Sequence, residues 1–407
     1  MTKPSTLLRG NAIVGQSGGC TAVINQSLAG VVDAARKVKG ITGLWGSLHG
    51  VNGLLDGRLI DLKAQPASLV NQIRALPSAA LGSSRHKMKE AEEHKVLENL
   101  RRWNVRYLFM IGGNDTAETL LRIVHAAEKA NYELRAVHIP KTIDNDLMET
   151  DHCPGYGSVA RFAAIATQEA GLDTKAMKQV DPVKMIELMG RNSGWIVAAS
   201  ALLKRSEIDP PHLLLLPEVP FSERFFLERV EKTLSRVGYC VVVLSETIRD
   251  AQGKRIGERK DGIMRDPFGH KYVESPAAIL CRLVEDRLNV RARFDKPGTL
   301  QRMSIPYVSL VDQKEAFEAG RQAVRWAIQG ISKVMVSFVR LKGAYKIKYK
   351  PVPLEKIPGR ERYLPSSFLN QEKTGVTQAF VRYALPLIGP NLPEFPTLQP
   401  IEQQRIA

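Results

Sequence analysis

The stretch PKTIDND at residues 140–146 brings one lysine, one threonine and two aspartates into a short loop. Asp144 could take the proton from an attacking hydroxyl group, and Asp146 could hold Mg²⁺, which prefers carboxylate and phosphate oxygens. Thr142 could donate a hydrogen bond to a phosphoryl oxygen, while Lys141 could neutralise the charge that develops there. The same residues also suit an ordinary polar turn. The combination of a cation, a hydroxyl and paired carboxylates nevertheless favours phosphoryl transfer to an alcohol.

Two glycine-rich turns are candidates for binding the phosphate donor. The turn SGGC contains Gly18 and Gly19, and its backbone amides and the helix predicted after it suit an anion. The turn IGGNDT contains Gly113, followed by Asn114 and Asp115. A carboxylate at position 115 would repel a bound nucleotide, so it indicates a short donor. Each turn alone is equally compatible with a tight turn that binds nothing.

Further polar side chains follow other predicted strands. Arg191, in the turn MGRNSG, could clamp a phosphate or the transferred phosphoryl group. Glu246 follows the run YCVVVLS and could accept hydrogen bonds from sugar hydroxyls or form a salt bridge at a strand end. Arg293 and Arg302 flank a Pro-Gly turn and could bind a remote phosphate. For Arg191 taken alone, a solvated surface arginine is the better interpretation, and surface exposure explains Arg293 and Arg302 equally well.

These residues need a sheet to position them, and the first 250 residues alternate β-rich runs with helical segments. This alternation predicts an α/β fold with a parallel sheet. In open α/β sheets the ligand lies beyond the carboxyl ends of the strands, so the turns that follow the strands should line one crevice. The predicted strands are Asn11–Val14, Arg106–Met110, Arg135–Ile139, Val183–Leu188, His212–Leu216 and Tyr239–Leu244.

The C-terminal part continues this pattern before it becomes rich in proline. Residues 311–330 have the spacing of an amphipathic helix that ends at Gly330, and residues 331–340 read as the next strand. The basic stretch at 340–350 alternates lysine with tyrosine and isoleucine, which predicts a surface strand. A proline-punctuated tail with a loose end follows.

Length, composition and charge limit the classes of protein to which this chain can belong. A chain of 407 residues with 44% hydrophobic residues is long enough for two domains or one large α/β unit. No apolar run could cross a bilayer, so we expect a cytoplasmic protein that does not bind membranes. The four scattered cysteines support neither disulfides nor a zinc site. A net charge of +16 suits phosphate-bearing substrates, while 6% aromatic residues and no basic-aromatic module argue against nucleic-acid binding.

In their order along the chain, the motifs SGG, LGSSR, GGNDT, PKTIDND, MGR, PEV, SET and GTLQR resemble those of the phosphofructokinase family. The resemblance extends from Gly15 to about Pro365. It implies two Rossmann-like three-layer α/β/α domains, with the active site in the cleft between them, plus a C-terminal extension. The implied division is a phosphoryl-donor domain of residues 1–155 plus about 301–350, and a sugar-phosphate domain of about 156–300 plus 351–407 that includes the C-terminal tail.

The resemblance also implies an activity, a cofactor and an assembly. The activity is transfer of a phosphoryl group to the 1-hydroxyl of fructose 6-phosphate in glycolysis or gluconeogenesis, with Mg²⁺ as cofactor, by a homo-oligomer that is a dimer or a tetramer. Asp144 matches the general base of the family, and Asp146 matches its neighbouring acidic residue. The other matched positions are Gly19 and Arg85 for the donor phosphate, Met189 and Arg191 with the adjacent Gly190 for the sugar and the phosphoryl group, Glu246 for a sugar hydroxyl, and Arg293 and Arg302 for the sugar phosphate.

Two positions bear on the phosphoryl donor. Members of the family that use ATP generally have glycine where this chain has Asp115, and most have glycine where it has Lys141; members that use pyrophosphate resemble this chain at both positions. The physics agrees, because Asp115 would place a carboxylate where the α-phosphate of ATP would lie. Lys141 supplies a cation to a donor that lacks the other contacts of a nucleotide. We therefore expect a reversible, pyrophosphate-dependent enzyme, with ATP dependence as the alternative.

Three positions depart from the family pattern. Asn114 replaces a metal-associated aspartate, so the Mg²⁺ environment has one negative charge fewer. Pro182 stands near an arginine that, in bacterial members, reaches the substrate of a neighbouring subunit, with Lys184 as a candidate replacement. Thr299 stands where histidine is common, which leaves room for another acceptor such as sedoheptulose 7-phosphate. A non-catalytic regulatory subunit is a further alternative, and the intact Asp144 argues against it.

Overall fold

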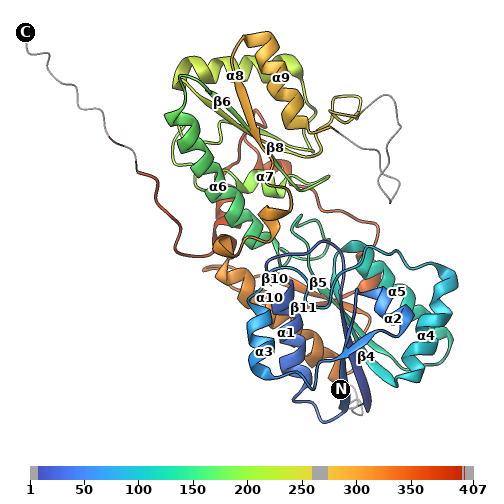
Figure 1. The fold of residues 1–407 in the computed structure, drawn as a ribbon. Coiled ribbons are helices and arrows are strands. Elements are labelled where there is room, and N and C mark those ends of the chain that lie inside the picture. The colour runs from blue at the N-terminus through green and yellow to red at the C-terminus, as the bar shows by residue number, and fades with distance from the viewer. Residues whose placement is uncertain (1–7, 259–273, 397, 399–407) are drawn as a thin grey trace, which may run out of the picture.

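The computed structural model describes residues 8–258, 274–396 and 398, whose strands form two sheets in two lobes (Figure 1). Within these residues, the larger sheet has the strand order β11-β10-β5-β4-β1-β2-β3 and the smaller sheet the order β7-β8-β6-β9. Helices cover both sheets, which confirms the predicted α/β class.

The strands are β1 (Gly10–Gln16), β2 (Ile41–Ser47), β3 (Leu59–Asp61), β4 (Val105–Gly112), β5 (Arg135–Pro140), β6 (Val183–Leu188), β7 (Leu213–Leu215), β8 (Cys240–Ser245), β9 (Ala292–Asp295), β10 (Val334–Arg340) and β11 (Ile347–Pro353). The α-helices are α1 (Ile24–Ala35), α2 (Val51–Asp56), α3 (Ala67–Arg74), α4 (Glu93–Arg102), α5 (Asn114–Lys129), α6 (Tyr156–Ala176), α7 (Trp195–Ala199), α8 (Glu223–Val237), α9 (Pro276–Leu288), α10 (Leu310–Ile328) and α11 (Gln378–Ala384). The 3₁₀ turns include η2 (Gly298–Arg302) and η4 (Leu354–Lys356).

The larger lobe is a three-layer sandwich. Its strands run parallel except for β3 and β11 at the two edges, which are antiparallel. The central strands are buried on both faces, as apolar runs such as YLFMI in β4 require. Helices α1 and α10 cover one face, and α2, α4 and α5 cover the other.

Two glycines allow α1 and α10 to pack with their backbones in contact. A Cβ atom added to Gly30 would lie 2.0 Å from the carbonyl oxygen of Phe317, and one on Gly320 would lie 2.1 Å from that of Ser27. No side chain fits at either position without moving a helix. This packing fixes α1, and therefore the glycine turn before it, against the larger sheet.

The smaller lobe has the same layered construction with a wholly parallel sheet. Helices α8 and α9 cover one face, and α6, α7 and α11 cover the other. The C-terminal helix is part of this core, because Phe380 and Ile388 are buried beside Tyr156 and Trp195. Residues far apart in the sequence therefore complete this lobe.

All six predicted strands are present, but they belong to two sheets. Strands β1, β4 and β5 lie in the larger sheet, and β6, β7 and β8 lie in the smaller one, so the two sets of turns face each other across the lobes. The sequence did not predict β2, β3 and β9, which contain glycines or are very short. Helix α10 and strand β10 are confirmed. Strand β11 begins later than predicted, because residues 341–346 reverse the chain.

The predicted division of the chain into domains near residue 350 stays a prediction. Strand β11 belongs to the larger sheet, and Leu354 and Ile357 pack into the core of the larger lobe. The N-terminal residues 1–7 and, in the predicted tail, residues 397 and 399–407 lie outside the described part of the chain. No helix within the described part is both long and apolar enough to span a lipid bilayer. The four cysteines are free thiols.

Candidate active site

The loop of residues 141–146 follows β5 at the carboxyl edge of the larger sheet. The backbone N–H of Lys141 donates to the carbonyl of Gly112 at 2.9 Å, which ties the loop to the turn after β4. The N–H of Asp144 donates to Oγ1 of Thr142 at 3.1 Å. These contacts turn the chain sharply and leave the two aspartates on either side of residue 145.

Asn145 holds the middle of this loop in an unusual conformation. Its φ angle of 56° lies in the left-handed region, which asparagine tolerates better than most residues. Its side-chain amide donates to the hydroxyl of Tyr383 and its amide oxygen accepts from the N–H of Cys153, both at 3.0 Å. The buried amide therefore fixes the positions of Asp144 and Asp146.

Arg362, from the C-terminal segment, clamps the same loop. Its guanidinium donates to the carbonyl of Asn145 at 2.8 and 3.1 Å and to that of Thr150 at 2.7 Å. Its backbone N–H donates to the carbonyl of Asp146 at 2.7 Å. The guanidinium carbon lies 4.6 Å from the ring centre of Trp195, a cation–π contact that anchors the clamp to the smaller lobe.

Gly18 and Gly19, between β1 and α1, form a turn that two cations approach. The Nζ of Lys141 donates to the carbonyl of Gly19 at 2.7 Å. A Cβ atom on Gly18 would lie 3.1 Å from this Nζ, and one on Gly19 would lie 2.7 Å from a guanidinium nitrogen of Arg302. Glycine thus leaves the space between the turn and the cations, and the arrangement suits a phosphate.

A second loop brings more positive charge to this turn. The N–H of Gly18 donates to the carbonyl of Ser84 at 2.9 Å, so the exposed Arg85 lies next to the glycine turn. Nζ of Lys87 lies 3.1 Å from a carboxylate oxygen of Asp115, in the first turn of α5. The Asp115 carboxylate therefore lies beside Lys87, two residues after Arg85.

Gly113 and Asn114 begin helix α5 on the same side. Gly113 is the N-cap residue, and the side-chain amide of Asn114 donates to the carbonyl of Arg360 at 3.1 Å. The buried amide oxygen of Asn114 has no hydrogen-bond partner among the described residues. An unpaired buried acceptor is costly unless a ligand or water satisfies it.

The turn after β6 supplies Gly190 and Arg191 from the smaller lobe. Both have positive φ angles, of 137° and 44°, so the chain bends sharply there. The hydroxyl of Ser193, in the same turn, donates to the carbonyl of Asp144 at 2.9 Å. This bond joins the loop of residues 141–146 in one lobe to the arginine-bearing turn of the other.

Glu246 and Arg302 reach the same region through the end of β6. The N–H of Glu246 donates to the carbonyl of Leu188 at 2.9 Å. The N–H of Met189 donates to the side-chain oxygen of Gln301 at 3.0 Å, and Gln301 precedes Arg302 in η2. The predicted sugar contacts therefore surround the carboxyl end of one strand.

Burial and neighbouring charges shift the pKa values of the ionisable groups in this region. Burial, reinforced by the charge of Asp146, raises the pKa of Asp144 to about 7, although Arg191 opposes this and Glu246 adds to it. Burial lowers the pKa of Lys141 to about 8, and Asp144 opposes that shift. Burial also raises the pKa of Asp146. These mutual effects show that the predicted residues of both lobes lie within electrostatic reach.

The oxygen ligands present fit a magnesium–phosphate complex. No three His, Cys, Asp or Glu side chains in the described residues are arranged to hold a metal ion by themselves. Mg²⁺ commonly takes one or two protein oxygens together with phosphate oxygens and waters. The carboxylate of Asp146 and the unpaired oxygen of Asn114 supply such ligands, and Glu361 lies close enough to help raise the pKa of Asp146.

Arg293 is the predicted site residue that the fold does not bring to this cluster. It lies beside Lys184 at the start of β6, and its guanidinium pairs with Asp181 at 2.9 Å. The turn with Met189 is roughly 16 Å away, five residues along the strand. Arg293 therefore lies at the opposite end of β6 from the turn that carries Met189.

Sequence reasoning missed the contributions of Lys87, Ser193, Glu361 and Arg362. Asn192 also belongs here, since its side-chain amide donates to the carboxylate of Glu361 at 3.2 Å. Lys87 stands two residues after Arg85, so the motif that identified Arg85 could have suggested it. The segment GRER before Tyr363 has no strand or helix pattern, and its role depends on how the chain returns to the site.

Comparison with known proteins gives a consistent result. A family model described as phosphofructokinase matches residues 11–327, so Arg362 lies beyond the match. Two proteins named pyrophosphate--fructose 6-phosphate 1-phosphotransferase are similar at 38% identity: that of Xanthomonas campestris pv. campestris (strain B100), over 95% of this chain and 93% of its own length, and that of Rhodospirillum rubrum, over 95% and 96%. A solved structure titled pyrophosphate-dependent phosphofructokinase, from Nitrosospira multiformis, superposes with a TM-score of 0.87 at 33% identity, over 95% of this chain and 94% of that one.

Proposed function

The chain belongs to the phosphofructokinase family, and we propose that it transfers a phosphoryl group from pyrophosphate to the 1-hydroxyl of fructose 6-phosphate. The products are fructose 1,6-bisphosphate and inorganic phosphate. The names of the similar proteins support this reaction. The main structural support is Lys141, a buried cation that donates a hydrogen bond to Gly19 and lies beside Asp144.

In the proposed mechanism, Asp144 accepts the proton of the 1-hydroxyl as that oxygen attacks the nearer phosphorus of pyrophosphate. The bond from this phosphorus to the bridging oxygen breaks, and inorganic phosphate leaves with the electron pair. Lys141, Arg191 and Arg302 offset the negative charge on the transferred group. Asp146 and Asn114 would hold Mg²⁺, which would supply further charge neutralisation when bound. In the reverse direction, protonated Asp144 acts as the general acid.

The donor preference rests on Asp115 and Lys141. The Asp115 carboxylate, paired with Lys87, stands at the start of α5, where the additional phosphate of a longer donor would meet negative charge. Lys141 offers a desolvated cation to a short donor, since contacts inside a low-dielectric site are stronger than in water. Both features favour pyrophosphate over ATP.

Arg293 bears on the proposed homo-oligomer. It lies at the opposite end of β6 from Met189 and pairs with Asp181, so its predicted contact with a sugar phosphate requires the site of a second copy. We propose a cytoplasmic dimer or tetramer with sites shared in this way. Analytical ultracentrifugation measures the oligomeric state, and the Michaelis constant of Arg293→Met for fructose 6-phosphate tests the shared site. A monomeric protein whose Michaelis constant does not change in Arg293→Met would contradict the proposed oligomer.

The decisive experiment is an assay of phosphoryl transfer to fructose 6-phosphate with Mg²⁺, with either pyrophosphate or ATP as donor. We expect kcat/KM to be at least a hundredfold higher with pyrophosphate. A higher value with ATP would overturn the donor assignment. Sedoheptulose 7-phosphate in place of the hexose tests the acceptor, because Thr299 leaves that choice open. Transfer from neither donor to either sugar would favour a non-catalytic subunit.

A further inference from the structure

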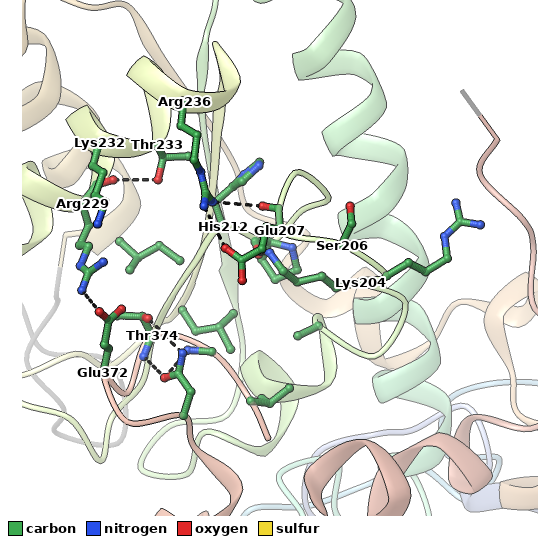
Figure 2. Close-up of a pocket in the computed structure, with 18 of the residues that line it drawn as sticks. Lys204, Ser206, Glu207, His212, Arg229, Lys232, Thr233, Arg236, Glu372 and Thr374 are labelled. Atoms are coloured by element: carbon green, nitrogen blue, oxygen red, sulfur yellow. Dashed lines mark hydrogen bonds and ion pairs between the residues drawn. The ribbon is translucent and has the colours of Figure 1, made fainter. Parts of the chain in front are cut away.

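His138 and His212 are both kept uncharged by burial, but their surroundings differ. His212 lines a cavity of about 560 Å³ beside β7 in the smaller lobe (Figure 2). Its Nδ1 accepts from the N–H of Val241 at 3.0 Å, and its Nε2 lies 3.2 Å from the carbonyl oxygen of Ile208. Burial lowers the pKa of His212 to about 4, and the charge of Lys204 adds to this shift. Because both ring nitrogens have partners, these bonds account for His212 as a structural residue.

His138 lies in β5 of the larger lobe, three residues before Lys141, and is fully buried. In the register of the sheet it stands between Met110 of β4 and Met335 of β10. Both methionines belong to the apolar core on the face that α2, α4 and α5 cover. Within the parts of the chain that the structure describes, neither ring nitrogen of His138 has a hydrogen-bond partner. His138 therefore lacks the bonds that account for His212.

A buried imidazole without partners lowers the stability of the fold. Burial of an unpaired polar group is unfavourable, whereas an apolar group of the same shape is neutral or stabilising at such a position. An apolar side chain of comparable volume would also suit the contacts with Met110 and Met335. The packing of the larger lobe thus gives no reason for a histidine here, and an unpaired buried group of this kind calls for a functional explanation.

The polar groups that act on this ring belong to the turn after β4 and to Lys141. Burial lowers the pKa of His138 to about 3; the carbonyl of Gly112 opposes this shift, the charge of Lys141 adds to it, and the carbonyl of Gly113 opposes it. The ring is therefore neutral near neutral pH and carries one N–H donor. The carbonyl of Gly112 accepts from the N–H of Lys141 at 2.9 Å and has a second lone pair for another donor.

The direction of the Gly112 carbonyl determines where the next amide points. The peptide unit is planar and trans, so the C=O of Gly112 and the N–H of Gly113 point in opposite directions. Apart from its neighbours in the chain, a Cβ atom on Gly113 would meet nothing closer than the carbonyl oxygen of Lys141, at 3.8 Å. Open space therefore lies beside the residue whose amide is predicted to bind the donor phosphate.

We propose that His138 is a positioning residue of the pyrophosphate site. When pyrophosphate binds, the ring N–H of His138 donates to the carbonyl of Gly112, beside the bond from Lys141, and this holds the N–H of Gly113 in the direction of the donor phosphate. The inference rests on the proposed function, because it assigns His138 to the donor side of that same site.

Nitrogen NMR of the whole protein, isotope-labelled at its histidines, tests this bond without relying on turnover. The probe is pyrophosphate with Mg²⁺ in the absence of a sugar, and the spectrum of His138→Gln identifies the resonances of His138. We expect the resonance of one His138 ring nitrogen to move along the saturation curve that calorimetry gives for pyrophosphate. Saturation without a change at His138 would overturn this inference alone, whereas absence of pyrophosphate binding would overturn the proposed function as well.

His138→Leu separates a positioning role from a structural one. Because it removes two unpaired polar atoms from the core, it should leave the urea midpoint of unfolding unchanged or raise it. It should raise the Michaelis constant for pyrophosphate about tenfold, the equivalent of one hydrogen bond, and change that for fructose 6-phosphate by less than about twofold. A lower urea midpoint with both Michaelis constants unchanged would show that His138 is only structural.

Two conservative variants and a matched control complete the test. His138→Asn and His138→Gln keep an N–H donor near the positions of Nδ1 and Nε2, and at least one of them should restore most of the affinity for pyrophosphate that His138→Leu loses. Failure of both would overturn the role of the ring N–H. In the control, His212→Leu, the loss of an imidazole with two partners should lower the urea midpoint and leave the Michaelis constant for pyrophosphate unchanged.

Discussion

Asp144 is held by its neighbours whether or not it is charged, so its role can be separated from its position. Its N–H bonds to Thr142 and its carbonyl accepts from Ser193, and neither contact uses the carboxylate. Asp144→Asn keeps the shape of the side chain but cannot take a proton. We expect kcat to fall by about 10²–10⁴-fold, with the dissociation constant for fructose 6-phosphate, measured by calorimetry, changed by less than about threefold. A similar loss in both quantities would remove the general-base role.

The donor preference that we propose rests on two side chains, Asp115 and Lys141, and can be tested on them. Lys141→Gly removes a buried cation from the glycine turn, so we expect the Michaelis constant for pyrophosphate to rise by roughly 10–100-fold, the equivalent of one charge-assisted hydrogen bond. Asp115→Gly removes the carboxylate that opposes a longer donor, and in combination with Lys141→Gly it should allow measurable turnover with ATP. The measurement is kcat/KM for both donors in the two single variants and the double variant. Pyrophosphate kinetics that do not change in the double variant would show that these positions do not set the preference.

The C-terminal segment stabilises the proposed catalytic loop, residues 141–146, chiefly through Arg362. Without its guanidinium, the carbonyls of Asn145 and Thr150 lose their donors and the loop can shift. A displacement of about 1 Å at a catalytic group can cost about 100-fold in rate. We therefore expect Arg362→Met to lower kcat by about 100-fold and to speed hydrogen exchange in residues 141–152.

Arg362→Lys is the matched variant, since it keeps the charge but cannot make the same set of bonds. It should recover only a small part of kcat. Full recovery would mean that charge near Asp146, rather than the clamp, is what Arg362 supplies.

A buried ion network ties the end of the same loop to α10. The two ring nitrogens of His152 lie 2.8 Å from a carboxylate oxygen of Asp151 and 2.7 Å from one of Glu315. Burial lowers the pKa of His152, but the two carboxylates outweigh it and raise the value to about 9. Because this lies above the ordinary value of about 6.5, the network stabilises the fold fully below pH 6.5 and loses this contribution as the pH rises through 9.

We expect the free energy of unfolding, measured by urea denaturation, to fall by up to roughly 3 kcal/mol between pH 6.5 and pH 9.5. His152→Gln should remove most of this dependence. His94→Gln is the control, because His94 is exposed on α4 and should leave the dependence as it is. Identical pH profiles for the protein and His152→Gln would show that the network does not titrate in this range.

Much of the molecule could be predicted because its signals are local. Buried parallel strands appear as short apolar runs, and a strand followed at once by PKTIDND places Lys141 and Asp144 at a sheet edge. The features that the sequence did not predict depend on contacts between residues that are distant in sequence. Arg362 donates to the carbonyl of Asn145, 217 positions away, and the sequence around Arg362 does not show that the chain returns to this loop. Arg293 matches a family motif, yet the pairing of β9 with the start of β6 keeps it away from Met189.

The return of the C-terminal chain makes the two lobes depend on each other. The ring of Phe380 is fully buried and lies 5.6 Å from that of Phe368 and 6.5 Å from that of Trp195, the residue on which Arg362 stacks. Phe380→Ala should therefore lower the free energy of unfolding by about 3–5 kcal/mol and lower kcat as well, since the support of the clamp is loosened. Phe380→Leu refills most of the space and should cost much less in both. Urea denaturation and kinetics of the two variants check this, and loss of stability without loss of kcat would mean that the aromatic cluster supports the smaller lobe but not the catalytic loop.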